Sequence, residues 1–420
     1  MMTDWKRITA ALAAALLSLS LCSCDLYDSL DMMLNDETPV DFGLEEEVRE
    51  RQKELGSLRG YSALQNDSER RVYAIVDLFA ADAERTHFVL SNDGTPDRLS
   101  EILEMYRSDH PEVFWISDQS GYEYSTHSTY TEVDLIYSFT GEELEEARKL
   151  FDEAVDAFLE SLPEDSDDYE KELYLNDYLL DLCEYDDAAA DREEVVANEQ
   201  NAYGALVDNM AVCEGYTRAF QLLCTKMGID CVPVNGTCDS EDLGNGNHIW
   251  NAVNIEDDWY YVDVTWNDVQ PDEEDYMLTE IERHLYFNIT TDALEDDHKI
   301  SPLYGSGEES DYYNAFVPEC TAESCSYFNR SVVHISSADD SDELCDALAR
   351  AAEYGSDTFE FFIEPDADYS EVVDEIVNSK AYEWITYANK QNDSDHQLSD
   401  DCRIYTYEEV GAAALSLEYE

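Results

Sequence analysis

Basic residues, proline and glycine are all scarce in this sequence of 420 residues. Only 24 Lys and Arg stand against 99 Asp and Glu, which gives a formal net charge of −75. A surface of that sign repels a phosphate backbone, so we expect no nucleic-acid partner. With 9 Pro and 16 Gly, the chain is neither collagen-like nor of low complexity. Aromatic residues make up 12%, which is too many for a disordered acidic chain and enough to build a core.

Long apolar runs are also rare, and the one at the N-terminus has the features of an export signal. Two basic residues precede the run 8–21, which is too short to span a bilayer of about 30 Å comfortably. The sequence Leu-Cys-Ser-Cys at 21–24 ends it and resembles a bacterial lipobox, with cleavage before Cys24 and lipid attached to that cysteine. Lipidation at Cys22 fits less well because a bulky Leu precedes it, and a plain signal peptide or an N-terminal anchor helix is an alternative. We therefore predict an exported protein that a lipid on Cys24 holds at the outer face of the cell membrane.

The 11 cysteines bear on disulfides and metal sites. Two belong to the export signal and Cys213 is assigned to chemistry below, so an even number remains. An even number in an exported protein permits disulfides, with Cys320–Cys325 and Cys345–Cys402 as plausible pairs, although buried thiols would explain several of them equally well. No Cys-x-x-Cys or His-x-x-x-His spacing appears among them. The sequence therefore predicts neither a metal site nor a cofactor.

Apolar periodicity divides the chain into the helices and strands of an α+β protein. A helix over 99–106 ends before Pro111, and the apolar residues of 110–116 predict a strand. The last part of the chain alternates strands and helices, with a helix predicted over 369–379. The predicted segments are a lipoprotein signal peptide at 1–23, an acidic stalk at 24–61, an α/β N-terminal extension at 62–165, a domain that carries the chemistry at 166–303, a linker at 304–325 and a small C-terminal α/β domain at 326–420.

The most informative feature is a cysteine at a predicted helix start. A short helix over 202–206 breaks at Asp208, and a new helix begins at Cys213 and stops at Gly228. At a helix N-terminus, backbone N–H groups and the helix dipole favour a thiolate over a thiol. Taken alone, a cysteine in this place is also consistent with a small buried apolar residue.

Two alternating segments follow, and they predict a hairpin that supplies a partner for this cysteine. Strands over 247–253 and 259–266 are joined by a tight turn. His248 and Asp263 lie 15 residues apart, so one hairpin can place their side chains side by side. A cysteine nucleophile needs a histidine in contact for proton transfer, and a carboxylate on the far ring nitrogen fixes the tautomer. The sequence thus predicts a site that joins Cys213, His248 and Asp263.

Three blocks resemble, in order, the bacterial transglutaminase-like superfamily of papain-like Cys-His-Asp enzymes. They are Cys-Glu-Gly-Tyr at 213–216, Asn-His-Ile-Trp-Asn at 247–251 and Tyr-Val-Asp-Val-Thr-Trp at 261–266. The resemblance implies that Cys213 is the nucleophile, His248 the general base and acid, and Asp263 the orienting carboxylate. It also implies a papain-like or transglutaminase-like core, in which the helix that bears the cysteine packs on an antiparallel sheet.

Other residues are candidates for the walls of the cleft and for the oxyanion site. The backbone N–H at the helix start is one candidate oxyanion donor, and the hydroxyl of Tyr203 is a second, although a core tyrosine would explain that residue as well. Trp250 and Trp266 are expected to wall the site, and packing alone would explain both. His284 and His298 can reach the cleft, but a hydrogen-bonded structural role is the simpler interpretation.

Two functions remain open from the sequence. The first is an exported, lipid-anchored cysteine enzyme that acts on amide or peptide bonds through a thioester, by hydrolysis or by transfer to an amine. Its expected partner is a protein or peptide substrate, either a cationic chain drawn by the acidic surface or a cell-wall peptide. The alternative is a catalytically silent binding or scaffold lipoprotein with the same fold.

Overall fold

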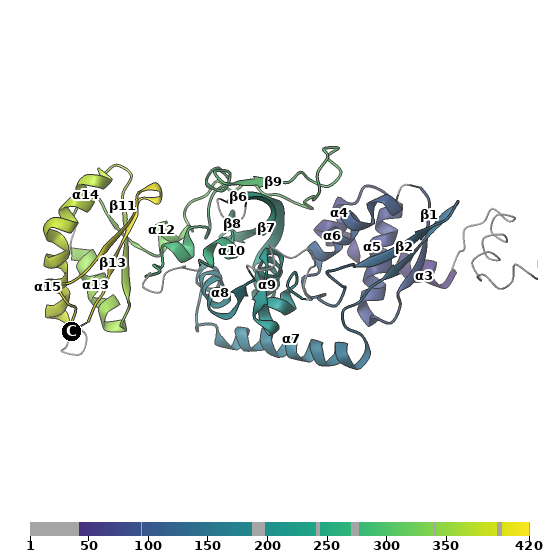
Figure 1. Cartoon of the computed structure of the whole chain (residues 1–420), viewed down its shortest axis with the longest axis horizontal. Helices are drawn as coiled ribbons and strands as arrows, with labels where there is room; N and C mark the ends of the chain where they lie inside the picture. The colour runs from purple at the N-terminus through teal and green to yellow at the C-terminus, as the bar shows by residue number, and fades with distance from the viewer. Residues whose placement is uncertain are drawn as a thin grey trace, which may run out of the picture. The chain divides into compact units, whose positions relative to one another are not determined.

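The computed structural model describes most of the chain from residue 42 onward. The described ranges are 42–93, 95–186, 198–240, 244–269, 277–339, 342–392 and 397–419. The predicted signal peptide, the lipidation residue Cys24 and the stalk up to residue 41 lie outside these ranges and remain predictions. Within the described ranges, no helix combines the length and the apolar character that crossing a bilayer requires. Helices and mostly antiparallel sheets confirm the predicted α+β class (Figure 1).

The chain divides into two compact units. The first contains the described residues up to Tyr106 and Ser120–Tyr137, and the second contains Arg107–Gln119 and everything from Ser138 onward. The elements of the first unit are α3 (Phe42–Gln52), η1 (Leu55–Ser57), α4 (Arg59–Ala63), α5 (Asp67–Asp82), β1 (His87–Ser91), η2 (Pro96–Arg98), α6 (Leu99–Asp109, whose last turn passes into the second unit), β2 (Tyr122–Thr126) and β3 (Tyr130–Leu135). Its strands lie in the order β1-β3-β2.

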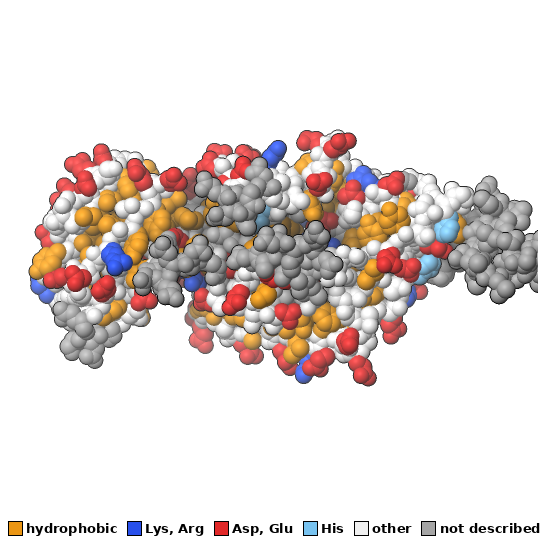
Figure 2. Space-filling model, in the orientation of Figure 1, with side chains coloured by type: hydrophobic (Ala, Val, Ile, Leu, Met, Phe, Trp, Pro, Cys, Tyr) orange, Lys and Arg blue, Asp and Glu red, His pale blue; other side chains and the backbone are white. Residues whose placement is uncertain are grey.

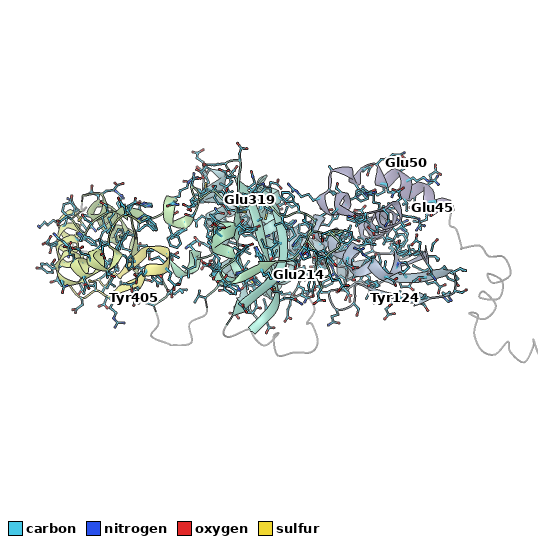
Figure 3. The ribbon with its side chains drawn as sticks, turned by 90° about the horizontal axis from the view of Figure 1, so that it is seen from above. Glu45, Glu50, Tyr124, Glu214, Glu319 and Tyr405 are labelled. Carbon is cyan, nitrogen blue, oxygen red and sulfur yellow. The ribbon has the colours of Figure 1, made fainter. Side chains whose placement is uncertain are left out.

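Helix α3 comes from the second half of the predicted stalk and is packed on α5. Glu45 of α3 (Figure 3) accepts hydrogen bonds from Arg71 of α5, and Arg51 pairs with Asp77. Val48 of the same helix is buried. Residues 42–52 are therefore part of the folded first unit.

The second unit begins with the elements that position the predicted site. They are α7 (Gly141–Ser161), α8 (Asp168–Leu182), β4 (Glu184–Tyr185), η4 (Gly204–Asp208), β5 (Met210–Ala211), α9 (Cys213–Met227), β6 (Asp230–Ser240), β7 (Gly244–Ile255), β8 (Asp258–Val262), α10 (Val264–Asn267), η5 (Glu282–His284), α11 (Thr291–Leu294) and β9 (His298–Ile300). The last four strands form an antiparallel sheet in the order β8-β7-β6-β9. Helix α7 belongs to this unit, whereas the sequence analysis had assigned it to the N-terminal extension 62–165.

Helix α9 packs against the hairpin of β6 and β7 (Figure 1). Side-chain to backbone hydrogen bonds fix it there. The hydroxyl of Thr217 donates to the carbonyl of Ile249 over 3.0 Å, and the amide of Asn251 donates to the carbonyl of Thr217 over 3.2 Å. The helix ends at Gly228, whose φ of 84° is a left-handed conformation that glycine adopts at little cost. These contacts set the N-terminal residue of α9, Cys213, beside strand β7.

The predicted strand at 110–116 is wrong. The segment is a series of turns, in which the N–H groups of His110 and Val113 donate to carbonyls three residues earlier. Its apolar residues are buried for another reason: the ring of Phe114 lies 4.7 Å from that of Phe151 on α7 and 4.8 Å from that of Tyr203. Burial in an aromatic cluster and burial in a sheet leave the same short apolar run in the sequence.

The C-terminal part forms a four-stranded sheet covered by helices. Its elements are α12 (Tyr327–Arg330), β10 (Val333–Ile335), α13 (Asp342–Tyr354), β11 (Thr358–Ile363), α14 (Tyr369–Glu375), the π-helical turn η6 (Ile376–Lys380), α15 (Ala381–Gln391), β12 (Ile404–Tyr407), η7 (Glu408–Val410) and β13 (Ala412–Ser416), with the strands in the order β10-β11-β13-β12. The predicted helix at 369–379 thus continues through η6 into α15. Trp384 of α15 is buried against Phe361 of β11, with ring centroids 5.8 Å apart.

Candidate active site

The structure brings together the three residues that the sequence placed in one site. His248 lies on β7 and Asp263 directly after β8, and Nε2 of the imidazole lies 2.5 Å from Oδ2 of the carboxylate. The Cys213 side chain, at the start of α9, is close enough to the same imidazole to contribute to the upward shift of its pKa. Because Nε2 is occupied by Asp263, Nδ1 is the ring nitrogen left for a proton exchange with the sulfur. The thiol is half-exposed, whereas the side chains of His248 and Asp263 are 5% and 1% exposed.

Burial and charge act in opposite directions on this pair. Burial by itself would lower the pKa of His248, but the charge and hydrogen bond of Asp263, together with Cys213, raise it well above its usual range. Burial by itself would raise the pKa of Asp263, but the charge and hydrogen bond of His248, together with those of His298, hold it well below its usual range. Both shifts favour an imidazolium beside a carboxylate, which is the charge state that supports a thiolate.

The backbone around Asp263 explains why its carboxylate points in this direction. Asp263 is the N-cap of α10, and its Oδ1 accepts the backbone N–H of Trp266 over 3.1 Å. Its own N–H donates to the carbonyl of Tyr286 over 3.0 Å. The capping bond takes one carboxylate oxygen and leaves the other, Oδ2, for His248.

The rings of Trp250 and Trp266, the two predicted wall residues, lie beside the imidazole of His248. The indole of Trp250 is fully buried, with its ring centroid 5.8 Å from that of His248, and Trp266 lies 6.1 Å from the same ring. A side chain at Gly236 of β6, opposite His248, would collide with the Trp250 ring and with the backbone of β9. The glycine therefore lets the indole lie flat over the strand.

Tyr203 lies in a different setting from the one that an oxyanion donor needs. Its ring packs against Phe114, Phe139 and Phe151. Burial raises the pKa of its hydroxyl, with a smaller effect from Asp208. None of these contacts joins it to Cys213 or His248, so an oxyanion role for this residue stays a prediction.

A second layer of polar side chains lies behind Asp263, and the sequence indicates only that one of them, His298, can reach the cleft. Nε2 of His298 lies 3.2 Å from Asp263 Oδ2, Nδ1 of the same ring lies 2.5 Å from Asp297 Oδ1, and the hydroxyl of Tyr286 donates to Asp297 Oδ2. Cys238 of β6 pairs directly across the sheet with His298. The only signal in the sequence was the Asp-His pair itself, because the pairing of β9 with β6 is long-range.

Two groups of described side chains have the spacing of metal ligands. One is His248, Asp263 and His298, and the other is Asp177, Glu280 and His284. In the second group, Nε2 of His284 lies 2.8 Å from Asp177 Oδ1 and Nδ1 lies 2.6 Å from the Glu280 carbonyl oxygen. Hydrogen bonds within each group account for the arrangement, and His284 is tied to this second group rather than to the site.

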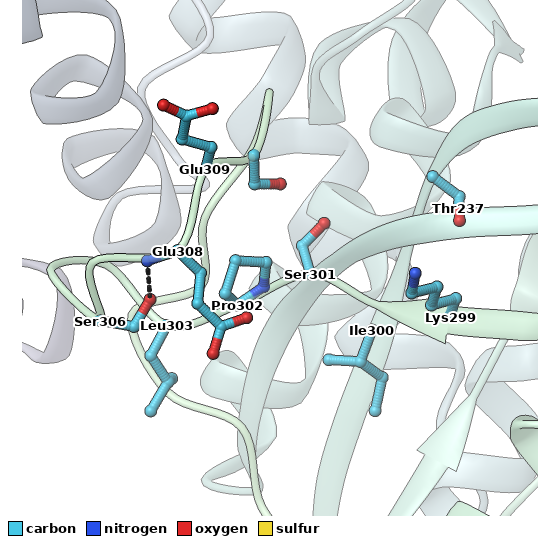
Figure 4. A pocket seen from close by; sticks show the side chains of 10 residues that line it. Thr237, Lys299, Ile300, Ser301, Pro302, Leu303, Ser306, Glu308 and Glu309 are labelled. Atoms are coloured by element: carbon cyan, nitrogen blue, oxygen red, sulfur yellow. Dashed lines mark hydrogen bonds between the residues drawn. The ribbon is translucent and has the colours of Figure 1, made fainter.

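A cavity of about 470 Å³ lies along the outer strand β9 (Figure 4). Lys299, the residue after His298, lines it together with Thr237, which pairs with Lys299 across the sheet. Glu308 and Glu309 contribute carboxylates from the loop that follows β9. A ligand bound along this edge of the sheet would therefore contact both positive and negative side chains.

Comparisons with known proteins include a family model that covers these three residues. The model of the transglutaminase-like superfamily matches residues 156–264, a range that includes Cys213, His248 and Asp263. Kyphoscoliosis peptidase of Mus musculus is 30% identical over 93 residues, and that of Homo sapiens is 29% identical over 122 residues. The matches cover 20% and 27% of this chain, and the chain spans only 14% and 18% of the length of these relatives.

Solved structures show a weaker likeness. A TGase crystal structure is 13% identical and has a TM-score of 0.27, covering 48% of this chain and 56% of its own. A cysteine protease candidate from Cytophaga hutchinsonii is 11% identical with a TM-score of 0.24, covering 34% of this chain and 61% of its own. Scores of this size carry no weight for the fold or for the activity.

Proposed function

Since residues 156–264 form a transglutaminase-like domain, we propose that the protein is an exported, lipid-anchored cysteine enzyme that acts on amide bonds through a thioester. The observation that supports the activity most is the meeting of Cys213, His248 and Asp263 at one point of the second unit. The location rests on the lipobox-like sequence that ends in Cys24.

The proposed first step uses each group in the state that the site favours. The Cys213 thiolate attacks the carbonyl carbon of an amide, and the electron pair of the C=O bond moves to the oxygen. A protonated Nδ1 of His248 gives its proton to the amide nitrogen, the C–N bond breaks, and an amine leaves. Asp263 keeps Nε2 protonated and in place, so the proton that moves is the one facing the sulfur.

The second step decides between hydrolysis and transfer. His248, now neutral, accepts a proton from water or from an amine as that nucleophile attacks the thioester, and the Cys213 thiolate leaves. Water yields a free acid, and an amine yields a new amide. The triad serves both outcomes equally, so the choice depends on which nucleophile the cleft admits.

Incubation of the purified protein with a peptide library and a labelled amine tests this proposal. New N-termini without label indicate hydrolysis, and label bound to peptides indicates transfer. A Cys213→Ala version run beside it removes contaminating activity from the comparison. Identical product profiles for the two proteins would contradict an enzymatic function and favour a binding or scaffold lipoprotein.

The charge of the molecule favours cationic substrates. Asp and Glu side chains are spread over much of the visible face, with few Lys and Arg (Figure 2), in agreement with the net charge of −75. A field of this sign raises the local concentration of cationic chains and is screened by salt.

We therefore expect turnover of a Lys-rich peptide to fall roughly fivefold between 50 and 500 mM NaCl, because screening weakens long-range attraction. The matched control is the same peptide with Gln in place of Lys, whose turnover should change little. Initial rates at low substrate concentration report the effect. Equal salt responses of the two peptides would show that the field plays no part in substrate choice.

A further inference from the structure

His298 stands between two carboxylates behind the triad. It opens strand β9, and its side chain is fully buried. Nε2 lies 3.2 Å from Asp263 Oδ2, and Nδ1 lies 2.5 Å from Asp297 Oδ1. The first distance lies in the usual range of N–H···O hydrogen bonds and the second is shorter, so each ring nitrogen has a carboxylate oxygen as its partner.

The chemistry of the partners fixes the protons on the ring. An ionised carboxylate can only accept hydrogen bonds, so a ring nitrogen that faces one must carry a hydrogen. Only an imidazolium can donate from both of these nitrogens at once. Asp297 completes its own bonding by accepting the hydroxyl of Tyr286 at Oδ2, and burial followed by the bond to Asp297 raises the pKa of that hydroxyl.

The contact with His298 also restricts Asp263. Oδ2 of Asp263 receives His248 and His298 together, while Oδ1 receives the backbone N–H of Trp266. Rotation of the carboxylate would break the bond to His298 as well as the bond to His248. Hydrogen bonding and charge from His298 are among the causes that keep the pKa of Asp263 low.

Packing holds the His298 ring in this place. Its centroid lies 4.4 Å from that of Trp266 and 5.0 Å from that of Trp250, the two predicted wall residues. The ring of His248 lies 5.5 Å away. At this separation, a charge on one imidazole changes the proton affinity of the other.

We propose that His298 is a positioning residue, held as an imidazolium between Asp263 and Asp297, that fixes the oxygen of Asp263 facing His248 and moderates the basicity of His248. This inference rests on the proposed function for its role in turnover, but the protonation of His298 does not depend on turnover. The titratable groups that face His298 or His248 are Cys213, Cys238, Asp263, Tyr286 and Asp297.

The first test reads the protons directly. In protein labelled with ¹⁵N-histidine, the side-chain nitrogen spectrum distinguishes an imidazolium from either neutral tautomer, and loss of one set of signals in His298→Gln assigns the ring. We expect both nitrogens of His298 to be protonated at pH 7. A neutral ring, with a bare Nδ1 or a bare Nε2, would overturn the proposal whether or not the protein turns over any substrate.

The second test uses variants and the pH dependence of Cys213 alkylation. Loss of the positive charge on His298 stabilises the protonated His248, so in His298→Gln we expect the alkaline limb of the profile to move up by roughly one pH unit. Asp297→Asn should move it in the same direction, because it removes the carboxylate that keeps His298 charged. Simple loss of an anion in Asp297→Asn would shift the alkaline limb downward, and such a shift would overturn the proposal. The absence of a shift in both variants would overturn it as well.

Turnover of two substitutions at the same position separates positioning from packing. Gln keeps an N–H for Asp263, whereas Phe keeps the ring between the two tryptophans but donates nothing. We expect a loss of about tenfold for His298→Gln and about a hundredfold for His298→Phe. The opposite order would show that the ring acts only as a packing element. Melting temperatures of both variants are measured beside the rates, and the alkylation profile of Asp297→Asn keeps the proposal testable if either variant is unfolded.

Discussion

Replacement of Cys213 by Ala is expected to lower turnover at least about 10⁴-fold, because the other thiol near His248, Cys238, is buried and out of reach of a substrate. The fold should persist, since the side chain is half-exposed at a helix start and the change to Ala removes only the sulfur atom. Rates measured on the best peptide of the library give the effect, and circular dichroism gives the fold.

A second cysteine provides the matched control for this substitution. Cys402 is also half-exposed but lies outside the transglutaminase-like match, just before β12. Cys402→Ala should therefore keep the rate of the wild-type protein. If Cys213→Ala retained a tenth of the activity or more, the nucleophile would be another residue.

Replacement of Asp263 by Asn is expected to lower turnover by about 10³-fold. The carboxylate accepts from His248 and His298 at one oxygen and from the N–H of Trp266 at the other. The side-chain amide of Asn has one acceptor oxygen and one NH2 group. In either orientation, this NH2 group faces the N–H of a residue that donated to the carboxylate. His248 then loses its fixed tautomer and the charge that stabilises its imidazolium.

The same change should affect stability in a pH-dependent way. One donor is left unsatisfied in a buried place, which costs about 1–3 kcal/mol in the free energy of unfolding. In the folded protein the pKa of Asp263 is held below its ordinary value of 3.8. The ionised carboxylate therefore stabilises the fold fully above pH 3.8, and this stabilisation is lost as the pH falls below 3.8 toward the lowered pKa. The difference in melting temperature between wild type and Asp263→Asn is therefore expected to shrink from pH 6 to pH 3.

A second His–carboxylate pair supplies the control for Asp263→Asn. Asp177 contacts His284 over 2.8 Å but touches none of the three triad residues. Asp177→Asn should keep the wild-type rate while changing the melting temperature. A rate for Asp263→Asn within a few-fold of that of Asp177→Asn would remove Asp263 from the catalytic group.

Local signals made the helix and the hairpin of the site predictable. Gly228 marks the end of α9, and alternation marks the strands on both sides of the turn between β7 and β8. The strand predicted over 259–266 ends at Val262, because Asp263 caps the short helix α10. The predicted transglutaminase-like core is confirmed by the family match over 156–264. These features depend on residues that are neighbours in the sequence, which is where pattern reasoning has its information.

The parts that could not be predicted depend on distant contacts. His298 reaches Asp263 only because β9 pairs with β6, which lies some sixty residues earlier in the chain. The turns at 110–116 owe their apolar residues to an aromatic cluster with Phe151 and Tyr203. In both cases the deciding neighbour is remote in sequence, so the local pattern predicts a strand at 110–116 and cannot tell that His298 contacts Asp263.

The central claim is that Cys213 is activated by His248, and alkylation by iodoacetamide at pH 6 tests it most directly. At that pH a free cysteine side chain is almost wholly the unreactive thiol. The account predicts that Cys213, identified by peptide mass, reacts at least about tenfold faster than a free cysteine and that His248→Gln abolishes the difference. A Cys213 no faster than a free cysteine, or one whose rate is unchanged by His248→Gln, would contradict it.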